Sequence, residues 1–475
     1  MRNPGSCEEI PLEQPADLSI GKPLIKVRAA VGSFEIPTDR GVRRWVPAAC
    51  GVLVFLIPVV GWATRQLPYD TEYEAIRYSS STPTDPVAQL QKRIQAGEVT
   101  LQLDARNGYL ASLLGELKIS AASQILVFSK TSFQPGLISS HTPRAIYFSD
   151  NVYVAWVQNS PVLEISALDP NLGPVFYTLN QEQSTFPRFK RETHLCLRCH
   201  DSYSLTGGGV PRYILGSGFA DQSGQLVSHE GWHLTTDQTP LNRRWGGWYV
   251  TGTHGDQLHM GNLVPRDAAE AVQLDLAAGA NLRDLDNLID TTPYLGKHSD
   301  IVALMVIEHQ VHLQNLITRV NYETRTALYR DTLRNRELGQ DPGYRSPATL
   351  KRIESDAEPL VRALLLADEA PLGGPIAGTS GFASEFVSQG PWDGQGRSLR
   401  QLDLTGRLFR YPLSYLIYSQ AFEALPDLAK KYIYRRLGEV LGGQDKSAAF
   451  AHLSDVDRQA IREILEATKT DFPGQ

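Results

Sequence analysis

Sulfur-containing side chains are scarce in this sequence, which has 475 residues but only four cysteines and three methionines. Cys7 lies in an N-terminal stretch of poor periodicity, and Cys50 lies inside a long apolar run. Only Cys196 and Cys199 remain for the body of the chain, and they are three residues apart. A framework of structural disulfides is therefore not expected, because both remaining thiols belong to one local motif.

The sequence also lacks a run of like charges, a low-complexity tract and a repeat of fixed period. Its formal net charge of -6 is small for this length. Nucleic-acid-binding proteins usually carry a basic patch or stripe, so no nucleic-acid partner is expected.

One long apolar segment stands out, at residues 45–63, which read WVPAACGVLVFLIPVVGWA and carry no charge. As a helix these residues would be roughly 28 Å long, close to the hydrocarbon thickness of a bilayer. Arg40, Arg43 and Arg44 precede the segment, and positive flanks stay on the cytoplasmic side. We therefore predict a cytoplasmic tail at 1–44, a transmembrane anchor at 45–63 and a body outside the cytoplasm.

Two alternatives to an uncleaved anchor remain open. Pro47 and Pro58 weaken a helix, and Ala63 could precede a cleavage site, so the segment could be a signal peptide. It could also be a buried core helix. The anchor and the signal peptide both export the rest of the chain.

Residues 196–200 read CLRCH, in which two cysteines are followed at once by a histidine. Each thiol of this pattern can add across one vinyl group of haem, and the adjacent imidazole can then bind the iron from one side. The pattern predicts one covalent haem c held by Cys196, Cys199 and His200. A zinc site would need two more ligands at short spacing, and a redox dithiol would favour a βαβ setting. Neither feature is found near this motif.

The motif CLRCH resembles the haem attachment site of c-type cytochromes residue for residue, although it covers only five positions. The wider layout is similar to that of bacterial membrane-anchored mono-haem cytochromes. These have an anchor, a β-rich segment, one haem motif and a long helical half. The chain departs from small soluble cytochromes c, whose motif lies near the N-terminus of a compact helical domain. Simple electron shuttling is therefore not carried over from those small proteins.

The residue on the other side of the iron is less clearly indicated. Residues 243–262 combine an aromatic strand-like stretch with a glycine-rich loop that contains His254, His259 and Met260. Glycines let a backbone approach a flat cofactor closely. We predict His259 as the second metal ligand, with Met260 and His254 as alternatives; a polar hairpin loop is the competing interpretation.

Two arginines at the start of the same stretch, Arg243 and Arg244, could pair with the haem propionates. A further group of candidates lies at 304–312, where Glu308, His309 and His312 would share one face of a helix. That face could supply a haem ligand, hold a separate metal, or form a polar interface inside the fold.

The periodicity along the chain predicts an α+β fold with one N-terminal transmembrane helix. A β-rich haem-binding region is expected at 70–262 and a helical region at 263–475. The expected strands are 125–129, 145–148, 152–157, 162–168, 174–179, 212–220 and 245–252. The expected helices are 85–95, 267–285, 300–336, 349–367, 402–425, 427–441 and 454–470.

These features together predict a single-pass protein of the cell inner membrane whose body faces the periplasm. Its expected function is electron transfer to or from a redox partner protein or the quinone pool. The alternative is a haem enzyme, a peroxidase-like or small-molecule oxidoreductase, with an open or exchangeable position on the iron. That alternative stays open because a chain of 475 residues around one haem is larger than electron shuttling requires.

Overall fold

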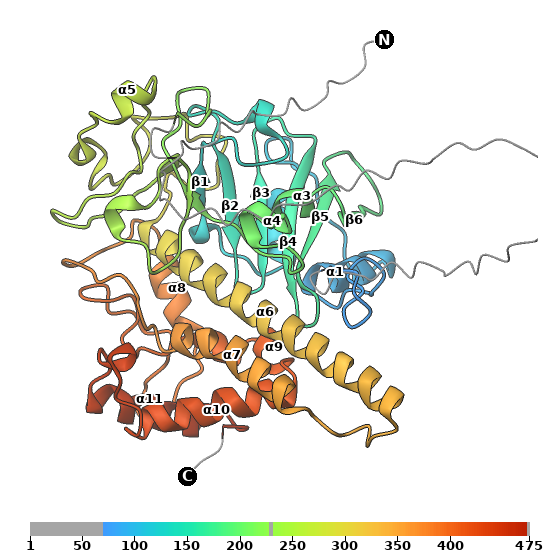
Figure 1. Ribbon diagram of the computed structural model, residues 1–475. Helices are drawn as coiled ribbons and strands as arrows, with labels where there is room; N and C mark the ends of the chain where they lie inside the picture. Colours follow the sequence, from blue (N-terminus) through green and yellow to red (C-terminus); the bar gives the residue numbers. More distant parts are fainter. Residues whose placement is uncertain (1–69, 228–230, 473–475) are drawn as a thin grey trace, which may run out of the picture. The chain divides into compact units, whose positions relative to one another are not determined.

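The structure is a computed structural model that describes residues 70–227 and 231–472. The predicted tail and the predicted membrane segment at 45–63 lie outside the described residues. All described residues belong to one compact unit (Figure 1).

A seven-stranded antiparallel sheet lies at the centre of this unit, with the strand order β6-β5-β4-β3-β2-β1-β9. Its longest pair, β4 and β5, is joined by a tight turn in which Gly173 has a φ of 68°, a conformation that favours glycine. The strands are β1 (Ile125–Val127), β2 (Arg144–Phe148), β3 (Val152–Trp156), β4 (Val162–Asp169), β5 (Gly173–Asn180), β6 (Phe189–Arg191) and β9 (Trp248–Tyr249). The structure confirms five predicted strands, β1 to β5. Their β-branched and aromatic residues suit a sheet that is buried on both faces.

The two faces of the sheet support separate hydrophobic clusters. On one face Leu163, Ile165 and neighbouring side chains pack with helices α1 (Pro86–Gln95) and α2 (Leu110–Glu116). On the other face Tyr153 and Phe176 pack with helix α6 (Ile301–Leu338). We call the second face the α6 face. Because side chains alternate along a strand, residues two apart in β4 and β5 share a face.

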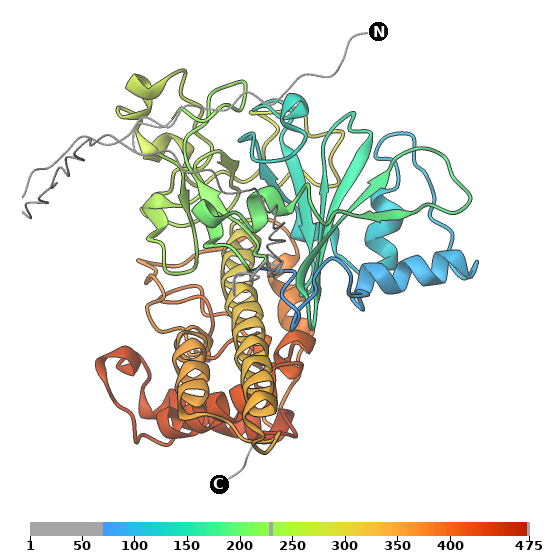
Figure 2. The ribbon, with the colours of Figure 1, turned by 45° about the vertical axis from the view of Figure 1, so that its right-hand side comes forward.

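Helix α6 is the longest helix described and links the sheet to the C-terminal helices. Asp300 caps its first turn by accepting hydrogen bonds from the backbone of Val302 and Ala303. Beyond the sheet the helix packs with α7 (Pro347–Leu364), and α10 (Asp427–Leu441) and α11 (Asp455–Thr468) lie beside that pair (Figure 2). The helices predicted at 300–336, 349–367, 427–441 and 454–470 are confirmed to within a few residues at their ends.

Shorter elements connect these parts. They are α3 (Leu197–His200), α4 (Tyr203–Thr206), β7 (Gly216–Ser217), β8 (His233–Leu234), α5 (Ala268–Ala271), α8 (Phe382–Ser388) and α9 (Gln420–Glu423). Strands β7 and β8 pair with each other, and only two residues of each predicted strand at 212–220 and 245–252 lie in a strand. One hydrophobic cluster contains residues from both predicted regions, 70–262 and 263–475, so these regions share a core.

Two predicted helices do not form as expected. Residues 267–285 contain only one turn of α-helix and a short 3₁₀ turn, and Asn281 has a left-handed backbone. Residues 402–425 contain only a 3₁₀ turn and the single turn α9, because Leu404 is left-handed and Pro412 lacks an amide hydrogen. The apolar side chains of 402–425 are largely buried nonetheless, which produces a helix-like pattern without a long helix. In 267–285, by contrast, Val272 is 64% exposed and Leu285 is buried, so that segment has no continuous buried face.

The predicted fold class is wrong in one further respect. It included an N-terminal transmembrane helix, but no helix within 70–227 and 231–472 is long and apolar enough to cross a membrane. The described part of the chain has an α+β fold built from the seven-stranded sheet and its packed helices.

Candidate functional site

The CLRCH motif forms one turn of helix at the α6 face of the sheet, after edge strand β6 (Figure 1). The backbone amide of His200 donates to the carbonyl of Cys196 across 3.0 Å, the spacing of an α-helical turn. Cys196 is half-buried against the core that contains α6, whereas Cys199 is exposed. The turn therefore places Cys196 and His200 on one side, with Cys199 facing outward.

The imidazole of His200 is held firmly on one of its two nitrogens. Its Nδ1 hydrogen-bonds the carbonyl oxygen of Arg212 at 2.7 Å, and the amide of Arg212 donates back to the carbonyl of His200 at 2.9 Å. The ring also packs against Phe176 of β5, with 4.4 Å between ring centroids. A carbonyl can only accept, so Nδ1 carries the proton and Nε2 carries the lone pair.

Nothing in the described part of the chain takes up that lone pair by a hydrogen bond. Burial is the largest cause of the lowered pKa of His200, which keeps the ring neutral near pH 7. A neutral imidazole that donates its Nδ1 proton to a carbonyl and keeps Nε2 free is the usual arrangement of a metal-binding histidine. The residues present therefore fit the proximal side of a haem.

The electrostatics of Cys196 argue against a redox dithiol. Burial and then the carboxylates of Glu192 and Glu164 raise the pKa of the Cys196 thiol to about 12. Reactive cysteines of disulfide-exchange proteins have lowered pKa values, because the thiolate is the nucleophile. The surroundings of Cys196 instead favour a neutral thiol.

The chain after the motif turns back sharply through three consecutive glycines. Gly207, Gly208 and Gly209 all have left-handed φ values, of 81°, 69° and 76°. Other residues are strained in this conformation. The three glycines therefore explain how the chain turns back, so that the carbonyl of Arg212 reaches the imidazole of His200 twelve positions earlier. Beside the turn, burial raises the pKa of Asp201 to about 6.

The α6 face carries a polar group close to the motif. Arg144 of β2 and Glu164 of β4 form an ion pair at 3.2 Å, and both side chains are largely buried. Ser132 and Gln134 donate two further hydrogen bonds to the same carboxylate. The Nε of Arg144 is buried and has no partner among the described residues.

The structure does not bring His259 to His200. His259 lies in the loop after β9, where Asn262 ties the loop to the backbone of Val250. Strand β9 is an edge strand, and β5, against which His200 packs, is five positions away in the sheet, about 24 Å at the usual strand spacing.

Helix α6 supports the same separation. Ile301 at its start binds the backbone of Thr251, next to β9, whereas Asn315 binds the backbone of Tyr213, next to Arg212. These two points are about four turns, or roughly 21 Å, apart along the helix.

The alternatives in the same loop already have partners. His254 bonds the carbonyl of Gln257 through Nδ1 and accepts from the amide of Asn281 through Nε2. The sulfur of Met260 accepts from the hydroxyl of Ser217 at 3.5 Å. His259 itself accepts from the amide of Gly261 through Nδ1, and burial lowers its pKa to about 3. Its proton therefore sits on Nε2, which leaves no free lone pair there.

Of the two arginines expected at propionates, Arg244 is engaged elsewhere. Its side chain is buried and donates to Glu308 at 2.8 Å and to the backbone of Asp237 and Thr239. The prediction that Arg244 binds a propionate is therefore not supported by its surroundings.

The two histidines of the predicted cluster on α6 share a hydrogen-bond partner, Asp237, that the sequence did not indicate. Asp237, in the loop after β8, accepts one hydrogen bond from Nδ1 of His309 and one from Nδ1 of His312, both at 2.7 Å. Asp237 is 72 residues before His309 in the chain, so no local spacing could have signalled this contact.

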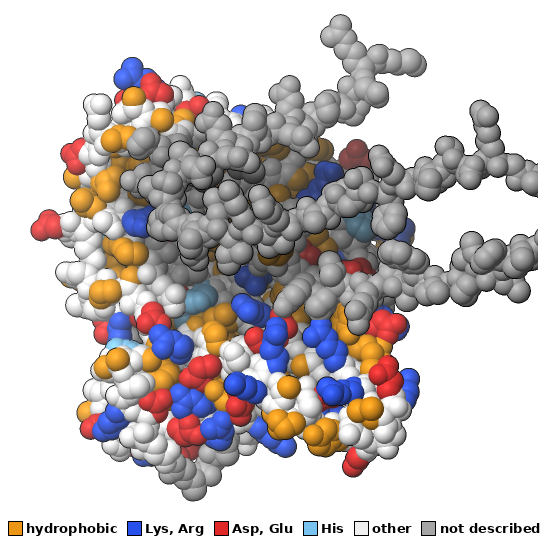
Figure 3. Space-filling view, viewed as in Figure 1, with side chains coloured by type: hydrophobic (Ala, Val, Ile, Leu, Met, Phe, Trp, Pro, Cys, Tyr) orange, Lys and Arg blue, Asp and Glu red, His pale blue; other side chains and the backbone are white. Residues whose placement is uncertain are grey.

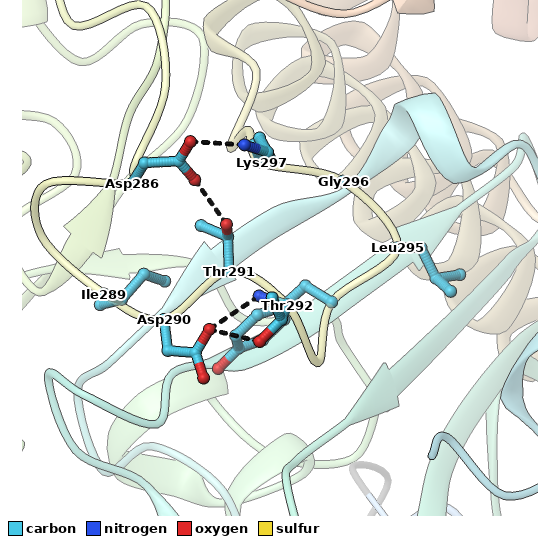
Figure 4. Close-up of a pocket in the computed structure, with 9 residues that line it drawn as sticks. Asp286, Ile289, Asp290, Thr291, Thr292, Leu295, Gly296 and Lys297 are labelled. Atoms are coloured by element: carbon cyan, nitrogen blue, oxygen red, sulfur yellow. Dashed lines mark hydrogen bonds and ion pairs between the residues drawn. The ribbon is translucent and has the colours of Figure 1, made fainter. Parts of the chain in front are cut away.

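One cavity, with a volume of about 460 Å³, is lined by residues of the loop 286–297 (Figure 4). There the carboxylate of Asp286 binds Thr291 and Lys297, and Asp290 binds Thr292. This lining contains no histidine or cysteine, so the cavity does not extend the haem motif.

The surface seen in Figure 3 mixes charges of both signs over α6, α7 and α10. Arg352, for example, pairs with Glu323 and Asp356, and Arg436 pairs with Glu358. This mixed pattern gives no indication of a nucleic-acid surface.

Comparison with known proteins adds no further assignment: neither a protein-family profile, nor a curated protein, nor a solved structure matches the chain. Within residues 70–227 and 231–472 there is also no group of three or more His, Cys, Asp or Glu side chains arranged to hold a metal ion.

Proposed function

We propose that this chain is a c-type cytochrome that carries one covalent haem c on Cys196, Cys199 and His200. Bound there, haem supplies an iron that cycles between two oxidation states. The residues of the chain would attach the porphyrin through two thioether bonds and bind the iron on one side.

The observation that carries this proposal is the orientation of His200. Its Nδ1 proton is directed to the Arg212 carbonyl, and its Nε2 lone pair is free, one helical turn from Cys196. A surface histidine needs no such anchor. The raised pKa of the Cys196 thiol also favours a cysteine that is consumed by a stable bond over one that cycles as a dithiol.

We further propose electron transfer as the activity, outside the cytoplasm, where the body of the chain would exchange electrons with a redox protein or with the quinone pool. Export is part of the proposal because c-type haem is attached outside the cytoplasm. A haem enzyme with an open position on the iron is the alternative, and exchangeable binding of small ligands by the reduced protein would favour it.

The test is production of the full chain in a bacterial host that attaches c-type haem. We expect haem to remain with the polypeptide on a denaturing gel, one haem per chain by mass. The double variant C196S/C199S should lose it, while the control C50S should keep it.

Two results would contradict the proposal. Haem that separates from the wild-type chain on denaturation would show that no covalent bond forms. An exported protein that carries no haem, in a host that attaches haem to other c-type cytochromes, would show that the motif is not used.

A further inference from the structure

The pair of histidines on α6 is organised around a single buried carboxylate. Asp237 is only 4% exposed, and its two oxygens each accept a hydrogen bond from one imidazole, that of His309 or that of His312. Both imidazoles therefore direct their Nδ1 atom toward the Asp237 carboxylate, which can accept a proton-bearing nitrogen on each oxygen.

The two imidazoles differ at their other nitrogen. Nε2 of His309 bonds the hydroxyl of Ser414 at 2.8 Å, and the His309 side chain is fully buried. Nε2 of His312 has no hydrogen-bond partner in the described part of the chain, and its side chain is 16% exposed. Only His312 thus offers a free, reachable lone pair, oriented by a carboxylate as in many metal-binding histidines.

His312 cannot form a metal site by itself. Among the described residues no third His, Cys, Asp or Glu joins it and Asp237 in a metal-binding group. A site of protein ligands alone would need about three or four donors. A haem iron held by His200 needs only one more ligand, such as a single imidazole.

The position of His312 in the fold points to the same partner. Asn315, one turn further along α6, binds both the amide and the carbonyl of Tyr213, at 2.8 and 2.9 Å. Tyr213 directly follows Arg212, whose carbonyl holds His200. Residues three apart on a helix are close neighbours, about 5–6 Å between their Cβ atoms.

Asp237 belongs to the same piece of chain. Strand β7 follows Tyr213, strand β8 precedes Asp237, and these two strands pair with each other. The segment before β7 contains Arg212, which orients His200, and the segment after β8 contains Asp237, which orients His312. The paired strands therefore connect the two residues that orient the imidazoles.

We propose that His312, positioned by Asp237, is the second axial ligand of the haem iron, in place of His259. This inference rests on the proposed haem attachment. It deepens the proposed function, because two imidazole ligands leave no open position and suit electron transfer rather than ligand turnover.

The test uses the haem-loaded full chain, with haem content measured first, so that a failure of haem attachment is recognised separately. The wild-type ferric protein should be low-spin by absorption and electron paramagnetic resonance. H312A should become high-spin and bind carbon monoxide when reduced, and added imidazole should restore the low-spin spectrum. H259A and the surface control H141A should both keep the wild-type spectrum.

A second variant tests the positioning role of Asp237. D237N replaces the anionic acceptor by a neutral one, which makes His312 a weaker donor and should raise the reduction potential while the haem stays low-spin. A purely structural Asp237 would leave the potential unchanged. A low-spin H312A protein, or a wild-type protein that is high-spin with full haem content, would overturn the assignment.

Discussion

The carbonyl oxygen of Arg212 accepts a hydrogen bond from Nδ1 of His200 across 2.7 Å, although the two residues are twelve positions apart in the chain. The left-handed turn at 207–209 makes this return possible. The most specific chemical feature of the site thus depends on backbone geometry and not on a further charged side chain.

That turn gives the first prediction. Gly208→Ala should destabilise the haem-free protein by about 1 kcal/mol, because φ is +69° there, even though the added Cβ meets nothing closer than 3.7 Å. Urea denaturation measures the change. Gly136→Ala is the control, since no positive φ and no nearby atom oppose it. Equal effects at both positions would contradict the role of the turn.

The second prediction concerns stability in acid. The depressed pKa of Asp237 means that its carboxylate stabilises the fold above the pKa of the unfolded chain, about 3.9, and that this contribution is lost as pH falls further. D237N should lower the free energy of unfolding at pH 7 by about 3 kcal/mol and flatten the acid-side slope. The exposed Asp256→Asn should change the stability by less than about 0.5 kcal/mol. An unchanged acid slope in D237N would refute this.

Glu308 should show the opposite dependence on pH. Burial, opposed by Arg244, raises the pKa of Glu308 to about 7, so the folded state keeps a proton that the unfolded state loses near pH 4.3. Stability should therefore fall as pH rises from about 4.3 to 7, by on the order of 1–3 kcal/mol, and then level off. Glu308→Gln should remove this fall in denaturation curves taken across the window. A wild-type curve without it would contradict the prediction.

The sequence predicts those parts of the structure that depend on local patterns, and it does not predict contacts between residues far apart in the chain. The β4–β5 pair and α6 were predictable because their patterns are local, as was the spacing of Cys196 and His200. The role of Asp237 could not be predicted, because its contact with His309 joins residues 72 positions apart in the chain. The prediction of a helix at 402–425 was wrong because this segment buries its aromatic side chains without forming a long helix.

The fourth prediction compares two helix caps. Asp300 caps α6 and also accepts hydrogen bonds from the backbone of Thr379 and Ser380, all while fully buried. Asp300→Ala should therefore cost about 3 kcal/mol of unfolding free energy. Ser454→Ala, at the exposed capping box of α11, should cost about 1 kcal/mol. Thermal and urea unfolding measure both, and a smaller loss at Asp300 would contradict the structure.

The fifth prediction concerns the two thiols of the haem-free protein. Cys196 is half-buried and its thiol has a pKa of about 12, whereas Cys199 is exposed. Alkylation of the native protein at pH 8 should therefore modify Cys199 first, as peptide mass mapping can show. Equal rates in the native protein would contradict the described burial; equal rates are expected only in denaturant.

The central claim is that haem is bonded covalently to both cysteines of the motif. The most direct measurement is the absorption spectrum of the purified wild-type protein in alkaline pyridine. This spectrum reports how many vinyl groups of the haem have been converted to thioethers. The account predicts the spectrum of a haem with both vinyl groups converted, one per chain. A spectrum with both vinyl groups intact, or no haem in a protein exported to the periplasm of a haem-attaching host, would contradict it.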